Sequence, residues 1–243
     1  MAALKQADIR NWVLSGLSPD EFALVASVLE EAPLRVGAIL ESAGEAAKSV
    51  YFVESGIISL VLPLEQGMRI EVGHVGREGV ACVHAALGSN MLTCEIVAQG
   101  AGAAYRADVP AIRQLIAECQ GLRESLAAFA NALHVQVAQT AACNGSHEVV
   151  QRLARWLLMA HDRMDDDTLS LTHEDISQVL GVTRPGVTIA AGALQKSGLI
   201  SYSRGKLTVV DRTGLEHSAC ECYANVADYY ESELAYLTRQ SGE

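Results

Sequence analysis

The sequence predicts an α+β protein: an N-terminal antiparallel β-roll, a long helix, a C-terminal winged helix-turn-helix and an extra C-terminal helix. Three observations support this prediction. Short β-rich runs alternate with glycine turns, a glycine-poor stretch with helical apolar spacing follows, and a helix-turn-helix pattern surrounds Gly181. We place the β-roll at residues 1–110, the long helix at 111–145, the winged helix-turn-helix at 146–210 and the helical extension at 211–243.

The size and composition of the chain fit two modest soluble domains. Its 243 residues are 50% hydrophobic, which is enough for a sizeable core and argues against global disorder. No apolar run approaches the roughly 20 residues that cross a bilayer. Residues 1–12 lack the charged segment and apolar block of a secretory signal. We therefore expect a cytoplasmic protein without a membrane partner.

The acidic charge of the chain is unevenly distributed. The formal net charge is −11, which taken alone argues against a nucleic-acid partner. Residues 170–210 nevertheless hold four Lys and Arg against two Asp and Glu. A locally basic surface can contact phosphates when the acidic residues lie elsewhere.

The cysteines do not predict disulfides or a metal site. The six are scattered over a chain without an export signal, so a disulfide framework is not expected. Only Cys220 and Cys222 are closely spaced, and His217 is the nearest histidine. That stretch has a helical pattern, in which side chains two apart point to different faces. Buried, inert thiols are the favoured interpretation, and we expect no metal and no cofactor.

Residues 33–105 have the pattern of a small antiparallel barrel. The run "SVYFVESGIISLVL" holds two β-rich segments around Ser55-Gly56, which predicts a strand, a tight turn and a strand. Further short strands separated by glycines follow in "GMRIEVGHVGREG" and "TCEIVAQGAGAAYRA".

A long helix is predicted from about Val109 to Cys143. Its apolar residues recur at three- and four-residue steps, and the stretch "NGSHE" at 144–148, with its Asn-Gly turn signal, is expected to break it. This stripe favours pairing with a second copy, and the alternative is a helix that lies on its own β-roll. The predicted dimerisation residues are Leu122, Leu126, Phe129, Leu133 and Val137.

The stretch "LTHEDISQVLGVTRPGVTIAAGALQKSGLISY" has the spacing of a helix-turn-helix. Thr172 and Asp175 approximate a capping box, and Gly181 stands where the chain must turn sharply. Pro185 would break a helix interior, but it falls in the first turn of the second helix, where its missing N–H has no intrahelical partner. A two-stranded wing with a turn near Arg204-Gly205 follows.

The order of these parts resembles the Crp/Fnr superfamily of bacterial transcription regulators. The stretch "VGAILESAGEAAKSVYFVESGIISLVL" is similar to the cyclic-nucleotide-binding-type β-roll. The stretch "LTHEDISQVLGVTRPGVTIAAGALQKSGLI" is similar to the DNA-binding motif of the family. The positions that carry the similarity are Gly37, Gly44, Tyr51, Phe52 and Gly56 in the first stretch, and Asp175, Ile176, Leu180, Gly181, Thr183, Arg184, Val187, Leu194, Gly198, Leu199 and Ile200 in the second.

The resemblance implies a homodimer that binds a palindromic double-stranded DNA site, with RNA polymerase as a candidate further partner. Arg184 matches the family's guanine-reading arginine. Pro185 replaces the usual base-reading glutamate, and Ile189 replaces a position that is commonly arginine or polar, so a different target sequence is expected. The predicted DNA-binding residues are Thr172, Thr183, Arg184, Pro185, Gly186, Thr188, Ile189, Arg204 and Lys206.

The β-roll departs from the nucleotide-binding members of the family. They carry an arginine and a small polar residue in the phosphate-binding cassette, and here Leu92-Thr93 stand at those positions. We expect no binding of cyclic AMP or cyclic GMP, and the small-molecule effector is unknown. The candidate effector pocket comprises Arg69, Arg77, Glu78, Leu92 and Thr93. No cysteine precedes Cys82, so the iron–sulfur ligand set of the oxygen-sensing branch is not matched.

Two other classes of function have weaker support in the sequence. An enzyme of the cupin kind needs a paired His-x-His motif, and His74 and His84 stand alone. A β-roll sensor that acts through protein contacts without specific DNA binding is the main alternative, because Pro185 and Ile189 weaken the reading helix. The tail repeats apolar residues from Leu215 to Leu237 and predicts a helix docked on the barrel or on the partner subunit.

Overall fold

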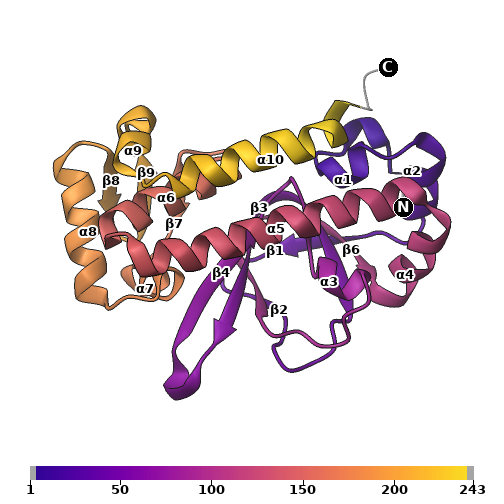
Figure 1. Ribbon diagram of the computed structural model, residues 1–243, viewed down its shortest axis with the longest axis horizontal. Helices are drawn as coiled ribbons and strands as arrows, with labels where there is room; N and C mark the ends of the chain where they lie inside the picture. The colour runs from indigo at the N-terminus through magenta and orange to yellow at the C-terminus, as the bar shows by residue number, and fades with distance from the viewer. Residues whose placement is uncertain (1–3, 240–243) are drawn as a thin grey trace.

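The N-terminal half folds into an antiparallel β-roll (Figure 1). The computed structural model describes residues 4–239, the side chains of Gln66 and of residues 235–239 excepted. The described strands pair in the order β1-β6-β3-β4, with β2 on β6 and β5 on β3. They are β1 (Glu30–Leu34), β2 (Ile39–Glu41), β3 (Ser49–Pro63), β4 (Arg69–Val75), β5 (Val80–Ala81) and β6 (Glu95–Asp108).

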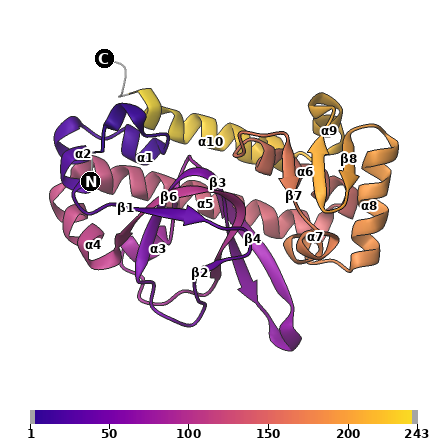
Figure 2. The same ribbon diagram turned by 180° about the vertical axis from the view of Figure 1, so that it is seen from behind.

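Short helices precede the first strand of the roll and connect some of its later strands (Figure 2). Ser18 caps the longest of them by accepting a hydrogen bond from Glu21 N, and a proline occupies its first turn. They are η1 (Gln6–Asp8), α1 (Trp12–Ser15), α2 (Pro19–Ala26), η2 (Glu65–Gly67) and α3 (Val83–Ala86).

The predicted long helix is two helices, α4 (Val109–Glu118) and α5 (Gln120–Ser146). The chain leaves the helical conformation at Cys119, where φ is −103° and ψ is 103°. The expected break within residues 144–148 is confirmed, because α5 ends at Ser146, His147 is its C-terminal cap and the next helix begins at Val149. The first turns of the predicted long helix therefore belong to a separate helix, and its C-terminal end at Ser146 lies one residue beyond the proposed boundary at 145.

Helix α5 lies on the β-roll of its own chain. The Phe129 ring covers Gly79 so closely that a Cβ there would lie 1.9 Å from a ring carbon. The Gln136 amide pairs with the backbone of β4, accepting from His74 N at 2.7 Å and donating to His74 O at 3.1 Å. It also donates to the Tyr230 hydroxyl at 2.9 Å. These contacts hold the helix against the sheet.

This packing corrects the predicted dimerisation stripe. Leu122, Leu126, Phe129 and Leu133 are at most 2% exposed within one chain, and Val137 packs against the same core. The four buried side chains have no surface left for a partner, and Val137 is half-buried. The alternative interpretation, a helix lying on its own roll, describes these residues.

The C-terminal half is a winged helix-turn-helix. Its strands form an antiparallel sheet in the order β7-β9-β8, and its first helix starts with a capping box between Glu148 and Gln151. The elements are α6 (Val149–His161), β7 (Thr168–Ser170), α7 (His173–Leu180), α8 (Arg184–Lys196), β8 (Ile200–Ser203) and β9 (Lys206–Val209).

The tail forms two helices instead of one, α9 (Arg212–Ser218) and α10 (Cys222–Arg239). Leu215 is buried in the winged-helix core, whereas Val226, Tyr230 and Leu234 of α10 belong to the β-roll core. Helix α10 runs back along α5 toward α1 (Figures 1 and 2). The expected docking on the barrel is confirmed. The predicted apolar stripe also included Leu237, whose side chain lies outside the described residues.

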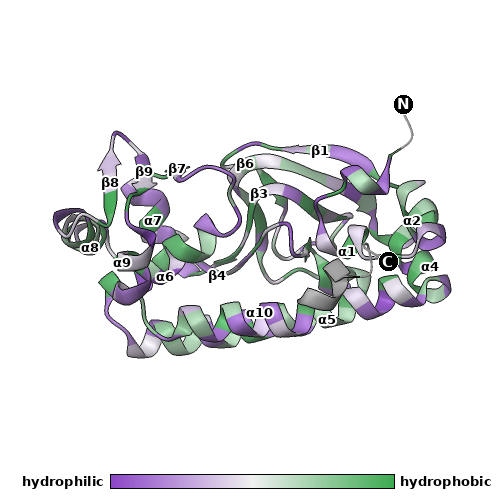
Figure 3. Cartoon of the chain, turned by 90° about the horizontal axis from the view of Figure 1, so that it is seen from above, coloured by the Kyte–Doolittle hydropathy of each residue, from purple (hydrophilic) through white to green (hydrophobic). Residues whose placement is uncertain are grey.

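The two halves share an interface at β4. Helix α7 packs on β4, and Trp156 of α6 donates to Glu71 Oε1 at 2.7 Å. Seen from above, α5 and α10 border one side of the molecule, and the apolar residues of β3 lie inside (Figure 3). Among the described residues, no helix is long and apolar enough to cross a membrane.

Candidate nucleic-acid interface

The helix-turn-helix forms as the sequence predicts. Thr172 Oγ1 accepts from Asp175 N at 3.2 Å, and Asp175 Oδ2 accepts from Thr172 N at 2.7 Å, which completes the capping box. Gly181 adopts a left-handed conformation at φ 61°, which a side chain would strain. Helix α8 begins at Arg184 with Pro185 in its first turn. The proline is therefore compatible with the helix, as predicted.

The outer face of α8 is open to solvent. Thr183, Arg184, Pro185 and Thr188 are exposed, and Ile189 is 72% exposed. The inner face is buried in the winged-helix core and comprises Val187, Ala190, Ala191 and Leu194. The N-terminal end of such a helix meets base edges in helix-turn-helix proteins.

Two of the predicted reading residues already have partners. Arg184 Nε lies 3.3 Å from Glu174 Oε2, and both side chains are at least half exposed. An exposed pair of this kind contributes little and can be exchanged for a nucleic-acid contact. The Thr188 hydroxyl donates to Arg184 O at 3.1 Å and lies 3.2 Å from His173 Nδ1. Gly186 is half buried, and a Cβ there would meet only Thr183 Oγ1 at 3.6 Å.

The wing presents two cations at its tip. Arg204 and Gly205 join β8 to β9 with φ values of 51° and 75°, which fit the type I′ turn of a two-residue hairpin. Arg204 and Lys206 are exposed on either side of this glycine. Thr172 lies beside the tip, with its methyl 3.8 Å from the position of a Cβ on Gly205. Its hydroxyl is used in the capping box.

The structure adds residues that sequence reasoning missed. An open depression of about 420 Å³ lies between α8 and the wing, lined by His173, Thr188, Ala191, Gly192, Gln195, Lys196 and Tyr202. The His173 and Tyr202 rings stack at 4.9 Å with 13° between their planes. Lys196 follows Thr188 by eight residues, a spacing that places both on one side of a helix. This spacing could have identified Lys196 from the sequence.

The five residues of the predicted effector pocket do not form one pocket. Leu92 and Thr93 line a cavity of about 500 Å³ between the β-roll and α5, with His84 and His134. Arg69 forms an ion pair with Glu95 beside this region and is not among its lining residues. The prediction failed because Arg69 begins β4 and the other four residues follow this strand in sequence, but the five side chains diverge in space.

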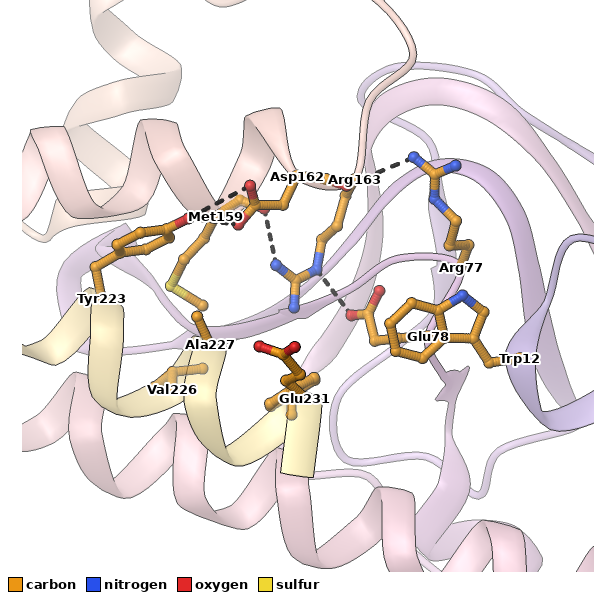
Figure 4. A pocket seen from close by; sticks show the side chains of 11 residues that line it. Trp12, Arg77, Glu78, Met159, Asp162, Arg163, Tyr223, Val226, Ala227 and Glu231 are labelled. Carbon is orange, nitrogen blue, oxygen red and sulfur yellow. Dashed lines mark hydrogen bonds and ion pairs between the residues drawn. The ribbon is translucent and has the colours of Figure 1, made fainter. Parts of the chain in front are cut away.

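Arg77 and Glu78 line a second cavity, of about 340 Å³, at the junction of the β-roll, α6 and α10 (Figure 4). Arg163 crosses this cavity and donates from Nε to Glu78 Oε1 at 2.7 Å. Its guanidinium carbon lies 5.6 Å from the centre of the Tyr230 ring. Arg77 Nη2 reaches Asp162 O at 3.5 Å.

Among the described residues that line the β-roll cavity, none is Lys or Arg. Burial, followed by the neighbouring His134, lowers the pKa of His84, which keeps its imidazole neutral near pH 7. The cavity is thus largely apolar, and its polar lining residues, apart from the thiols of Cys82 and Cys94, are Ser89, Thr93, His84 and His134.

Comparison with known protein families agrees with this architecture. The family of cyclic nucleotide-binding domains matches residues 31–119, and the Crp-like helix-turn-helix domain matches residues 151–218. Among proteins with curated functions, none matches the sequence significantly.

Solved structures of bacterial regulators have the same fold. A protein from Eubacterium rectale, described as a transcriptional regulator of the Crp/Fnr family, is 18% identical with a TM-score of 0.66; the match covers 84% of this chain and 96% of that one. FixK2 from Bradyrhizobium japonicum is 17% identical with a TM-score of 0.65, covering 79% and 98%. A CRP-family transcriptional regulator from Thermus thermophilus is 21% identical with a TM-score of 0.62, covering 77% and 96%.

A β-roll connected through a long helix to an exposed winged helix-turn-helix defines a two-domain, DNA-binding transcription regulator. The chain belongs to the Crp/Fnr superfamily, on the evidence of both matched domains in the family order and the shared fold of the solved relatives.

Proposed function

We propose that the protein binds a palindromic DNA site as a homodimer, with α8 of each protomer in the major groove, and that an uncharged small molecule regulates it. The exposed N-terminal end of α8 supports this most directly. Arg184, Thr188 and Ile189 face solvent there, and the wing of the same domain carries the exposed cations Arg204 and Lys206. Arg184 reads guanine, Ile189 contacts a thymine methyl, and Arg204 and Lys206 contact phosphates.

The dimer forms through the outer side of α5. One set of exposed residues on this helix follows alternating steps of four and three, which is the spacing of a coiled-coil seam. The set comprises Ala127, Asn131, His134, Ala138, Ala141 and Gly145. Small side chains allow two helices to approach closely, and the pair would set the two α8 helices about one turn of DNA apart, roughly 34 Å.

The effector binds in the β-roll cavity. Its lining includes Leu133, His134 and Val137 of α5, so an occupant would touch the helix that also carries the dimer seam. A neutral, largely apolar molecule fits the absence of Lys and Arg among the described lining residues.

The test of DNA reading starts from sites selected out of a random DNA pool with the purified full chain. Arg184→Ala should weaken the selected site by about 1–3 kcal/mol and relax preference at one base pair per half-site. Lys206→Ala should weaken all sequences alike and lower the salt slope by about one. If Arg184→Ala binds its selected site as tightly as wild type, the proposed register of α8 is wrong.

The test of assembly is the molar mass by light scattering. Ala138→Arg places a charge at the centre of the proposed seam and should yield monomers with weakened DNA binding. Ala117→Arg, exposed on α4, is the matched control and should remain dimeric. A monomer mass for the wild type with and without DNA would exclude the homodimer.

A further inference from the structure

Three cysteines and one histidine converge where α5 ends and α10 begins. Cys143 lies in the last turn of α5 and His147 is its cap, while Cys220 and Cys222 border the break between α9 and α10. One ligand atom from each of these four residues lies within 4.8 Å of all the others. The three cysteines form a small buried cluster separate from both cores.

The break between the tail helices creates this cluster. A continuous helix would have turned Cys220 and Cys222 to different faces, as the sequence led us to expect. Residues 219–221 are not helical, so both sulfurs turn toward α5. Cys143 and His147 are four residues apart at the end of a helix, which places them on one side of it. His217 is exposed and lies outside the cluster.

The distances match one tetrahedral ion. Cys143 Sγ lies 3.5 Å from Cys220 Sγ, and Cys222 Sγ lies 3.6 Å from His147 Nδ1. Zinc–ligand bonds of about 2.3 Å to sulfur and 2.0–2.1 Å to nitrogen give tetrahedral edges of about 3.8 and 3.5 Å. We propose that Cys143, His147, Cys220 and Cys222 bind one structural Zn²⁺ ion.

The surroundings of the cluster have the features of a metal site. His147 Nε2 lies 3.3 Å from Glu221 Oε2, and a carboxylate on the second ring nitrogen orients a metal-ligating imidazole. Gln139 Nε2 donates to Cys222 Sγ at 3.1 Å. Hydrogen bonds of this kind stabilise a thiolate ligand.

Two buried arginines supply the charge balance. Binding of Zn²⁺ to three thiols and one imidazole releases three protons and leaves a net charge of −1 at the site. Arg152 and Arg155 of α6 are 9% and 5% exposed, and each has a buried Nε without a hydrogen-bond partner. Arg152 interacts electrostatically with Cys143 and Cys220, and Arg155 with Cys143. A bound thiolate set would give these cations the negative partner that buried charges require.

The ion has a structural role. All four positions of a tetrahedron are taken by protein ligands, and a catalytic site keeps one position open. The ion links the end of α5 to the connection between α9 and α10, beside the first helix of the DNA-binding half. It thereby fixes how the winged helix-turn-helix is joined to the long helix.

The experiment measures metal uptake by the full chain, reduced and freed of metal by a chelator. Competition with a chromophoric zinc indicator should give one Zn²⁺ per chain. Co²⁺ in its place should give thiolate-to-cobalt charge-transfer bands and tetrahedral d–d bands. His147→Ala, Cys143→Ser and Cys222→Ser should each weaken uptake at least 100-fold, and Glu221→Gln about 10-fold. Cys94→Ser and His217→Ala, outside the cluster, should bind as wild type.

Zinc uptake is measured without DNA. A negative result would therefore contradict the zinc site alone and would leave the proposed DNA-binding function untouched. Circular dichroism verifies that each variant is folded, and His147→Ala, at a helix end, is the variant least disruptive to the core. A folded, reduced chain that takes up no zinc would overturn the proposal, as would uptake that persists in folded His147→Ala. The proposal would also be wrong if the purified chain contains a Cys143–Cys220 disulfide and still binds no zinc once that disulfide is reduced.

Discussion

At the scale of single residues, the two halves of the protein are joined by buried polar groups. Arg163 and Glu78 form an ion pair whose side chains are 7% and 6% exposed. Arg163 also donates to Met159 O at 2.8 Å, and Glu78 accepts from Gly76 N at 3.0 Å. Such a pair adds little net stability over an apolar one, but the loss of either partner leaves a desolvated charge.

Replacing Arg163 alone should be costly. Arg163→Met leaves the Glu78 carboxylate buried without its cation, and the free energy of unfolding should fall by about 3–5 kcal/mol in urea titrations. The double variant Arg163→Met/Glu78→Gln removes both charges and should recover part of the loss. A single variant as stable as wild type would contradict a buried, charged pair at this junction.

His74 should make stability depend on pH. Burial lowers its pKa most, Arg163 acts in the same direction, and Glu71 and Glu78 oppose them. The unfolded chain then takes up a proton near the ordinary pKa of about 6.5, before the folded chain does. The free energy of unfolding should fall as the pH drops below about 6.5, by up to about 1.4 kcal/mol per unit.

His74→Gln should reduce this pH dependence between about pH 6.5 and 5 in chemical unfolding, whereas His217→Gln, on the surface, should leave it unchanged. If the free energy of unfolding of His74→Gln depends on pH as steeply as that of the wild type, other groups cause the acid sensitivity.

The local residue chemistry of the helix-turn-helix was predictable, because caps and turns depend on neighbours in sequence. Thr172, Gly181 and Pro185 take the roles that their spacing indicated. The division of the predicted effector pocket was not predictable, because Leu92 and Arg77 are close in sequence but lie in different cavities. The cysteine cluster was missed for the opposite reason, since its members are far apart in the chain.

At the scale of elements, the helix faces were predictable but their partners were not. The apolar stripe of α5 was interpreted as an interface with a second subunit. Periodicity shows that one face of a helix is apolar, but it does not show which element covers that face. The end of α5 was predictable, because its last residue, Ser146, and its cap, His147, both lie in the turn-forming stretch 144–148.

Helix α10 should stabilise the β-roll although it follows the DNA-binding half in sequence. Val226 and Leu234 are at most 2% exposed in the β-roll core. Val226→Ala and Leu234→Ala should lower the free energy of unfolding, by about 2–5 kcal/mol for the leucine. Asp228→Ala, on the exposed side of α10, is the matched control in thermal unfolding. Equal stability of Leu234→Ala and Asp228→Ala would mean that α10 is not docked in solution.

At the scale of the whole molecule, α5 connects the cavity to the DNA-binding half. One side of the helix contributes Leu133, His134 and Val137 to the β-roll cavity, and its C-terminal end leads into α6. Helix α7 rests on β4, the strand that also pairs with Gln136 of α5. An occupant of the cavity would therefore contact α5, which packs on the same sheet as the first helix of the reading motif.

The chemistry of that occupant follows from the cavity. A cyclic nucleotide carries a fixed negative phosphate, and burying it without a cation costs several kcal/mol even after relaxation. Thr93 cannot neutralise a phosphate, Arg69 is paired with Glu95, and Arg77 lines the other cavity. Calorimetric titration with cyclic AMP or cyclic GMP should therefore give no saturable heat at about 100 µM.

Leu92→Arg is the matching gain-of-binding variant, because it places a guanidinium in the cavity at the position where the nucleotide-binding relatives of the chain are expected to carry one. This variant should bind cyclic AMP more tightly than wild type if the missing cation is what excludes the nucleotide. Saturable binding by the wild type near 100 µM, about −5.5 kcal/mol, would show that another group neutralises the phosphate. In that case Arg69→Ala and Arg77→Ala would identify the group, since each removes one of the two cations nearest to the cassette in sequence.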